Sequence, residues 1–239
     1  MSAETQYQIF SEELFRRMAI DGFRKKSRST AQKKQGSIFL RLVLYTNKLR
    51  NLDCIRQTYI ISQKYPEIDE IIYYLQNEYF SSNWATGRIW LCTLMPVTAK
   101  TSGLPNAVAP NGYTHYLNDD MDIFQLVEEV YSNIVTYAYP FWKKYNSPQA
   151  VLLGLEKQCP ELKTWAVSGS DLFQLACYLF FHEKEQALAF GEQRLATAQC
   201  GGSARTAITA EILTRADKLC YGSDGKLVVP SRPADAKIR

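Results

Sequence analysis

The chain has 239 residues, of which 46% are hydrophobic and 22% charged, and it carries 28 Lys and Arg against 24 Asp and Glu. This composition can supply a sizeable buried core, and no apolar run reaches the ~20 residues that a membrane-spanning helix requires. The formal charge of +4 is mild, so it excludes a histone-like polycation or an acidic solvating tail as a description of the whole chain.

The N-terminal segment and the cysteines both bear on location. Residues 1–19 contain Glu4, Glu12 and Glu13 and no continuous apolar stretch, which is unlike a signal peptide. The six cysteines include no CxxC pair, so their spacing fits neither a zinc site nor a disulfide-dense secreted domain. We predict reduced thiols, a cytoplasmic location and no membrane association.

The opening segment shows helical periodicity. Phe10, Leu14 and Met18 recur every four residues, and Gly22 lies where a C-terminal cap belongs. The spacing predicts a helix over about residues 4–20.

Strand patterns come next. Residues 37–45 alternate Ile38, Leu40, Leu42 and Leu44 with a second set of side chains, and residues 54–62 form a similar apolar run. The short polar connection between the two runs predicts a hairpin.

The middle of the chain alternates helix, strand and loop signals. Pro66 begins a helix with an apolar stripe, and residues 87–95 return to strand alternation that ends at Pro96. Residues 97–118 hold several Gly and Pro without periodicity, which predicts a long loop of functional or mobile character.

Helices dominate the second half of the chain. Residues 118–120 (Asn-Asp-Asp) are the expected cap of a helix that runs to Ala138 and is stopped by Tyr139-Pro140. Pro148 begins another helix. Three more are expected at residues 171–182, 185–199 and 204–219, before a flexible tail at 221–239.

These elements predict an α+β fold, with a small antiparallel sheet packed with helices and a helical C-terminal appendage. The expected division is an α+β domain over residues 1–160, a helical appendage over 161–220 and a tail over 221–239.

A basic cluster is the strongest local anomaly. Residues 16–56 carry a net charge of +10, so the remainder of the chain is at −6. Its segment 24–34 contains six cations and no carboxylate: Arg24, Lys25, Lys26, Arg28, Lys33 and Lys34. The cluster is a candidate site for a partner or an anion, either the phosphates of a nucleic acid or an acidic protein surface. The alternative is a solvated loop, or edge-strand charge that discourages sheet pairing.

Aromatic residues are abundant, with 15 Tyr, 11 Phe and 4 Trp. Tyr73, Tyr74 and Trp84 fall close together and are candidate interface anchors, although core packing explains them as well.

Motifs for catalysis or metal binding are missing. His115 and His182 are the two histidines, and the HExxH pattern that begins at His182 fails because Gln186 replaces its second histidine. The acids at 119, 120 and 122 do not have EF-hand spacing. We predict no metal and no cofactor, and we assign no catalytic residue. An enzyme without a recognisable sequence motif remains one hypothesis.

The order of features resembles that of bacterial proteins in the domain family of unknown function 4304. The resemblance covers about residues 5–158 and depends on three motifs: Gly22-Phe23-Arg24-Lys25-Lys26, Tyr139-Pro140-Phe141-Trp142 and Ser147-Pro148. The chain departs from the family pattern in its long basic first connection and in the 97–118 loop. Because α+β proteins of this sort are often encoded near bacterial toxins, the resemblance implies an immunity or adaptor role.

The sequence supports three hypotheses for the function. The first is a non-enzymatic protein that binds and blocks a partner, such as a toxin encoded nearby. The second is a nucleic-acid-binding accessory protein that uses residues 24–34. The third is the motif-free enzyme.

Overall fold

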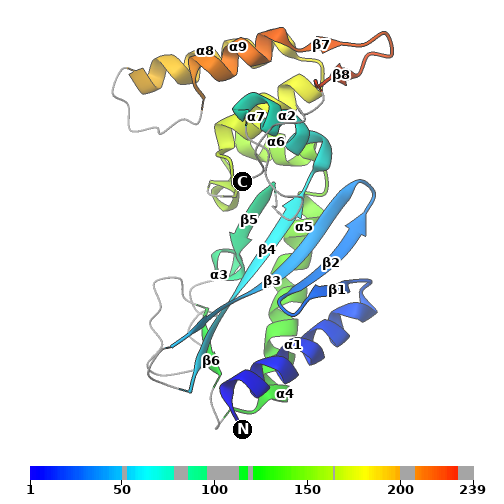
Figure 1. Ribbon diagram of the computed structural model, residues 1–239, viewed down its shortest axis with the longest axis vertical. Helices are drawn as coiled ribbons and strands as arrows, with labels where there is room; N and C mark the ends of the chain where they lie inside the picture. The colour runs from blue at the N-terminus through cyan, green and yellow to red at the C-terminus, as the bar shows by residue number, and fades with distance from the viewer. Residues whose placement is uncertain are drawn as a thin grey trace. The chain divides into compact units, whose positions relative to one another are not determined.

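The computed structural model describes residues 1–49, 53–77, 86–95, 113–117, 121–163, 165–199 and 208–230. They form an α+β fold with a six-stranded antiparallel sheet and a set of helices, which confirms the predicted fold class (Figure 1). The chain divides into two compact units. We call residues 1–63 with 88–145 the sheet unit, and residues 64–87 with 146–239 the helical unit.

The sheet has the order β1-β2-β3-β4-β5, and β6 pairs with β4 away from this path. Its strands are β1 (Arg24–Ser27), β2 (Thr30–Gln35), β3 (Ile38–Lys48), β4 (Ile55–Lys64), β5 (Gly87–Trp90) and β6 (His115–Leu117). The predicted strands at 37–45 and 54–62 are therefore β3 and β4, each extended at its C-terminal end. Part of the connection between them lies outside the described residues.

The basic first connection expected from the sequence is a β-hairpin rather than a loop. β1 and β2 pair antiparallel, and β2 continues in register along β3, with Ala31 opposite Leu42. Ala31 is fully buried and anchors an otherwise polar strand. Gly36, with φ +61°, makes the turn into β3, where a left-handed backbone favours glycine. β1 is an edge strand of the sheet.

Helix α1 (Ala3–Ile20) confirms the predicted opening helix. Its N-cap, Ser2, accepts a hydrogen bond from the backbone N–H of Thr5. Tyr7, Phe10 and Met18 are buried along one side of the helix, and Phe10 packs against Tyr59 of β4. Successive side chains of a strand point to opposite faces, so Arg56 and Thr58 of β4 point away from the face on which Tyr59 contacts α1. Helix α1 therefore covers only one face of the sheet.

The predicted strand at 87–95 is shorter than expected. β5 ends at Trp90, and Leu91–Leu94 form the helical turn α3. Leu91 and Cys92 are both buried, so the apolar run fits a buried turn as well as a strand. Residues 97–112 and 118 of the expected long loop lie outside the described residues, and residues 115–117 form β6 instead of loop.

The long helix of the sheet unit does not stop at Tyr139-Pro140. α4 (Ile123–Asn133) passes into a π-helical turn, η2 (Ile134–Ala138), and then into α5 (Tyr139–Lys144). The N–H of Tyr139 bonds to the carbonyl of Ile134, and Pro140, which has no N–H to donate, is the second residue of α5, directly after the π turn. The described cap is Asp122, whose side chain accepts from Phe124 and Gln125, whereas residues 118–120 are not described.

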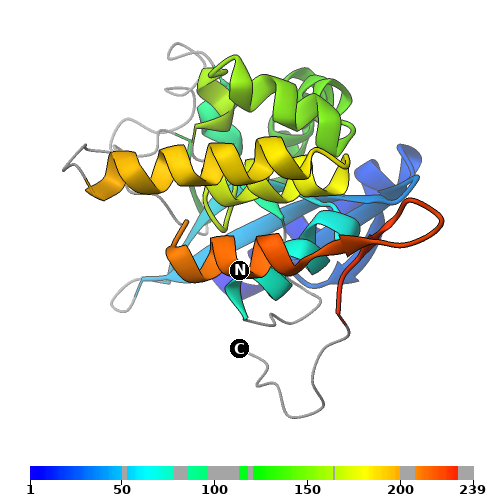
Figure 2. The same ribbon diagram turned by 90° about the horizontal axis from the view of Figure 1, so that it is seen from above.

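The helical unit gathers the remaining helices. They are α2 (Pro66–Gln76), α6 (Pro148–Glu156), η3 (Pro160–Leu162), α7 (Ser170–Phe180), α8 (Lys184–Gln199) and α9 (Ala210–Lys218). α8 and α9 lie alongside each other (Figure 2). Ser147 caps α6 at the predicted start, but α9 begins later than residue 204, because Ile208 and Thr209 are not helical and Thr209 is the N-cap.

The boundaries of the two units differ from the predicted division near residue 160. α2 packs against α7 through its apolar stripe, and Gly87 bridges to Ala166, so residues 64–87 join the C-terminal helices. The predicted tail is structured in part: β7 (Cys220–Tyr221) and β8 (Leu227–Val228) form a hairpin, while residues 231–239 are not described. Among the described residues, no helix has the length and apolar character to span a membrane.

Candidate binding surface

The strands of the sheet have an unusual charge composition. None of β1 to β6 contains an Asp or a Glu. The same strands carry ten cations: Arg24, Lys25, Lys26, Lys33, Lys34, Arg41, Lys48, Arg56, Lys64 and Arg88. Carboxylates of the sheet unit lie instead on and beside its helices, for example Glu4 and Glu12 on α1 and Glu129 on α4. Charge is therefore segregated between the layers.

The structure brings all six predicted basic residues together on one hairpin. Arg24, Lys25 and Lys26 lie on β1, Arg28 in the turn, and Lys33 and Lys34 on β2. They do not share one environment, because successive side chains of a strand point to opposite faces of the sheet.

The cations that face α1 are already engaged. Lys25 lies 3.8 Å from the carboxylate of Glu12, and Arg28 pairs with Glu4. Lys33 Nζ donates to the backbone carbonyl of Asp21 at 2.8 Å. These three side chains hold the hairpin to α1, so half of the predicted cluster has a structural role.

The opposite face of the sheet, away from α1, is its outer face. By strand alternation and register it presents Arg24, Lys34, Phe39, Arg41, Tyr45, Arg56, Arg88 and Trp90. Within the described part of the chain, Arg24, Lys34 and Arg56 have no ion-pair partner. Arg41 is positioned by its Nε, which donates to Gln32 Oε1 at 2.7 Å. This face therefore carries excess positive charge.

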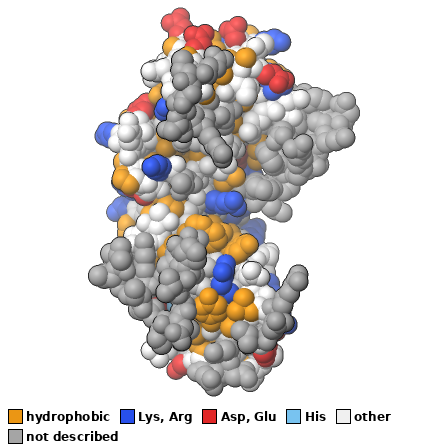
Figure 3. Space-filling view, turned by 90° about the vertical axis from the view of Figure 1, so that its left-hand side faces the viewer, with side chains coloured by type: hydrophobic (Ala, Val, Ile, Leu, Met, Phe, Trp, Pro, Cys, Tyr) orange, Lys and Arg blue, Asp and Glu red, His pale blue; other side chains and the backbone are white. Residues whose placement is uncertain are grey.

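Aromatic side chains lie among these cations. Tyr45 is 50% exposed, and its ring meets that of Trp90 edge to face with centroids 5.8 Å apart. The ammonium of Lys34 lies 5.8 Å from the ring centroid of Phe39. Figure 3 shows one side of the molecule on which Lys and Arg side chains lie next to hydrophobic ones. Tyrosine, tryptophan and arginine are the residues most enriched at the energetic centres of protein interfaces.

Sequence reasoning missed these aromatic residues as site candidates. The signal was present, because the alternation that buries Leu40, Leu42 and Leu44 also places Phe39, Arg41 and Tyr45 together on the other face. Of the predicted interface aromatics, Tyr73 and Tyr74 are half-buried on α2 in the helical unit, and Trp84 lies outside the described residues.

A polar network lies within the sheet unit. Tyr59 Oη and His115 Nδ1 are 2.9 Å apart, and His115 Nε2 lies 3.5 Å from Glu129 Oε1. Tyr113 Oη donates to the same carboxylate at 3.3 Å. The hydrogen bond from His115 lowers the pKa of Glu129, while burial raises the pKa of Tyr59 and of Tyr113. His115 and both tyrosines are buried and Glu129 is partly exposed, so the network joins β4, β6 and α4 and reaches solvent only at Glu129.

The other sequence candidates for chemistry are structural where they are described. His182 follows α7 and stacks on Tyr221, with ring centroids 4.6 Å apart. Asp122 is a helix cap, and Asp119 and Asp120 are not among the described residues. The described residues contain no group of three or more His, Cys, Asp or Glu able to hold a metal ion.

Comparison with known proteins gives no assignment: no protein-family model, no curated protein and no solved structure matches this chain.

Proposed function

We propose that this protein is a non-enzymatic, cytoplasmic binding protein that docks an acidic surface of another protein on the outer face of its sheet. The resemblance to the domain family of unknown function 4304 suggests an immunity or adaptor role, in which the bound partner is a toxin encoded nearby. The observation that carries the proposal is the acid-free sheet, on whose outer face Arg24, Lys34 and Arg56 have no ion-pair partner among the described residues.

Charge complementarity explains how such a surface selects its partner. A field of one sign speeds encounter with an acidic surface and disfavours basic ones. Arg24, Lys34 and Arg56 supply that field without competition from a neighbouring carboxylate of the described chain. Tyr45 and Trp90 supply aromatic contact area on the same face.

The packing of the aromatic rings on the outer face favours a protein partner over a nucleic acid. Sequence-tolerant binding of single strands needs exposed ring faces on which bases stack. Here the rings of Tyr45 and Trp90 pack on each other, and Lys34 lies over Phe39. In addition, three cations of the 24–34 segment are bound by α1 and Asp21, which leaves fewer for phosphates.

Nucleic-acid binding is the second candidate function, because arginines and aromatic residues alternate on a sheet face as they do on single-strand platforms. The two candidates differ in salt dependence. A protein that neutralises several phosphates of a nucleic acid releases their counterions. The logarithm of its binding constant therefore falls steeply and linearly with the logarithm of the salt concentration.

The test uses the full-length protein and the product of the adjacent gene. The two are co-expressed, and the affinity is measured by calorimetry for the native chain and the triple variant Arg24→Glu/Lys34→Glu/Arg56→Glu. Each buried charge contact is worth a tenfold change or more, so we expect at least a hundredfold weaker binding. The variant Lys157→Glu/Lys163→Glu/Lys218→Glu has the same net charge and should bind as the native protein does, because its exposed lysines lie in the helical unit.

Three outcomes contradict the proposal. One is a neighbouring gene product that neither co-purifies nor is toxic. Another is equal loss of affinity in both triple variants, which would indicate an effect of net charge alone. The third is salt-dependent binding of a 20-nucleotide single strand that the sheet variant abolishes, which would support the second candidate.

A further inference from the structure

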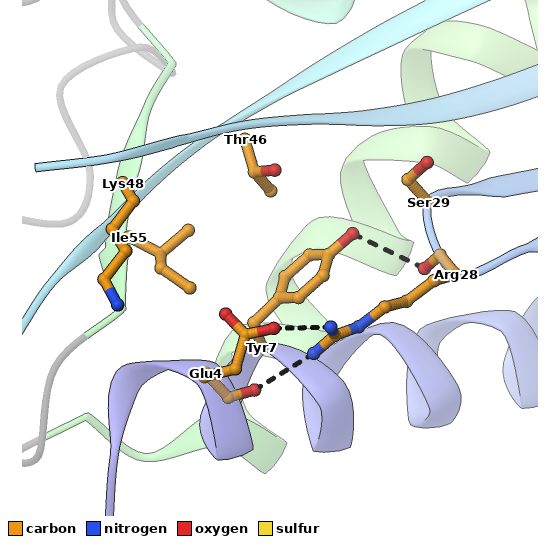
Figure 4. Close-up of a pocket in the computed structure, with 7 residues that line it drawn as sticks. All are labelled: Glu4, Tyr7, Arg28, Ser29, Thr46, Lys48 and Ile55. Atoms are coloured by element: carbon orange, nitrogen blue, oxygen red, sulfur yellow. Dashed lines mark hydrogen bonds and ion pairs between the residues drawn. The ribbon is translucent and has the colours of Figure 1, made fainter.

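A pocket of about 290 Å³ lies in the sheet unit, at the end of the sheet near the start of α1 (Figure 4). It is formed by four separate elements, α1, the β1–β2 turn, β3 and β4. The lining residues are Glu4, Tyr7, Arg28, Ser29, Thr46, Lys48 and Ile55. Thr46 and Lys48 alternate with Tyr45 along β3, so this pocket opens on the face of the sheet opposite to the outer face.

Two of its three charged groups cancel. Glu4 Oε1 forms an ion pair with Arg28 Nη1, and Arg28 Nη2 donates to the backbone carbonyl of Glu4 at 3.4 Å. The guanidinium also lies 5.0 Å from the ring centroid of Tyr7, which fixes it at one wall. The Glu4–Arg28 pair therefore contributes no net charge.

The third charged group is the ammonium of Lys48. Its side chain is exposed at the pocket, and it has no ion-pair partner among the described residues. Asp53, a nearby carboxylate, instead accepts from the N–H of Ala3 at 3.4 Å and is not part of the lining. The pocket thus has a net charge of +1.

The remaining lining separates into polar and apolar parts. Thr46, on the same face of β3 as Lys48, and Ser29, beside Arg28, supply hydroxyl groups. Ile55 and Tyr7 are only 4% and 5% exposed, and supply an apolar floor. In Figure 4 Ile55 lies beside Lys48, with Tyr7 between them and Arg28.

From this arrangement we propose that the pocket binds a small monocarboxylate. The carboxylate lies against the ammonium of Lys48, and the apolar body lies on Ile55 and Tyr7. A dianion such as phosphate is disfavoured because the single ammonium of Lys48 offsets only one of its two charges. The volume is at the lower limit of ordinary ligand sites, which restricts the ligand to a small metabolite or the end of a peptide. This inference is independent of the function proposed above.

The experiment measures binding by chemical-shift changes in the full-length protein. The probes are butanoate, its neutral isostere butanamide, inorganic phosphate, and an N-acetylated dialanine with a free carboxylate. A single charged contact predicts a dissociation constant on the order of 1 mM for butanoate. Stronger binding of the dialanine identifies a peptide end as the source of the carboxylate, and stronger binding of butanoate identifies a small metabolite.

Variants test the role of Lys48. Lys48→Gln should weaken butanoate binding about tenfold, and Lys48→Arg should retain it because the charge is kept. Lys26→Gln removes an exposed cation of the same sheet outside the pocket and should have no effect. Since Lys48 is exposed, these variants leave the core intact. Equal binding of butanamide, tighter binding of phosphate, or full affinity of Lys48→Gln for butanoate overturns the proposal. So does the absence of chemical-shift changes at a butanoate concentration 100 times the expected dissociation constant.

Discussion

The hydroxyl of Tyr139 donates a hydrogen bond of 2.6 Å to Oδ2 of Asp21, a residue 118 positions earlier in the chain. Tyr131 donates to the same oxygen at 2.7 Å. On a regular α-helix two residues eight positions apart differ by about 80° in direction. The π turn between them inserts one extra residue, which reduces the difference to about 20°. The π turn of η2 thus places both phenols on the carboxylate that follows α1.

Removing this carboxylate should destabilise the sheet unit. Asp21→Ala leaves two phenol groups without their charged acceptor, so we expect a loss of about 2 kcal/mol in the free energy of urea unfolding. The double variant Tyr131→Phe/Tyr139→Phe should lose a similar amount, and combining it with Asp21→Ala should add little. Additive effects would show that the hydrogen bonds are not the cause.

The contact between Tyr59 and His115 predicts a second stability effect. Tyr59→Phe removes the hydroxyl 2.9 Å from His115 Nδ1 and leaves that nitrogen unpaired in a buried site. The expected cost is about 1–3 kcal/mol, measured by chemical denaturation. Tyr45→Phe is the matched control, because Tyr45 is half exposed and the loss of its hydroxyl leaves no buried polar atom unpaired among the described residues. Equal stability of the Tyr59 variant and the native protein would contradict the prediction.

Acid stability should depend on Glu129. The hydrogen bond from His115 lowers its pKa below the ordinary value of 4.5, so the unfolded chain binds the proton more tightly than the folded one. The resulting stabilisation is complete above about pH 5 and is lost as the pH falls through the folded pKa.

The measurement is the free energy of unfolding between about pH 5 and pH 3. In Glu129→Gln the free energy of unfolding should fall less as the pH is lowered over this range, because the carboxylate that takes up the proton on unfolding is gone. Glu192→Gln, which changes an exposed carboxylate of α8, should decline as the native protein does. Identical pH profiles for the two variants would exclude Glu129 as the source.

Gly87 is predicted to reject any side chain. A Cβ at this position would lie 2.0 Å from Cε2 of Trp165, a ring that is fully buried in the helical unit. We expect Gly87→Ala to cost about 3 kcal/mol in thermal or chemical unfolding, because the rigid ring has no room to move. Gly191→Ala is the comparison: its Cβ would meet the flexible end of Leu213, and alanine favours the helix. A smaller cost at Gly87 than at Gly191 would show that Trp165 can shift.

Periodic segments were predictable from the sequence. α1, α2, α6 and β3 each show an apolar repeat that matches one secondary structure, and the structure buries that repeat. Aperiodic or polar segments were not. β1 and β2 have few apolar side chains, and they are strands because β3 supplies the hydrogen-bonding edge and the buried Leu42 opposite Ala31.

The candidate binding surface was likewise predictable only in part. The sequence identified the six cations of residues 24–34 as a group, and their positions on adjacent strands keep them together. It did not separate those that bind α1 from those on the outer face, and it did not add Arg41, Tyr45, Arg56 and Trp90. Membership of that face depends on strand register and on which side α1 covers.

The sequence alone determined the α+β class, the positions of the most regular helices and strands, and the concentration of positive charge early in the chain, since these follow from local periodicity and composition. The tertiary structure decided which cations are neutralised, how residues 64–87 join the C-terminal helices, and how one π turn aligns two tyrosines on Asp21. These features depend on contacts between residues far apart in sequence, whose pairing is selected by the burial of whole surfaces and is not encoded in any short segment.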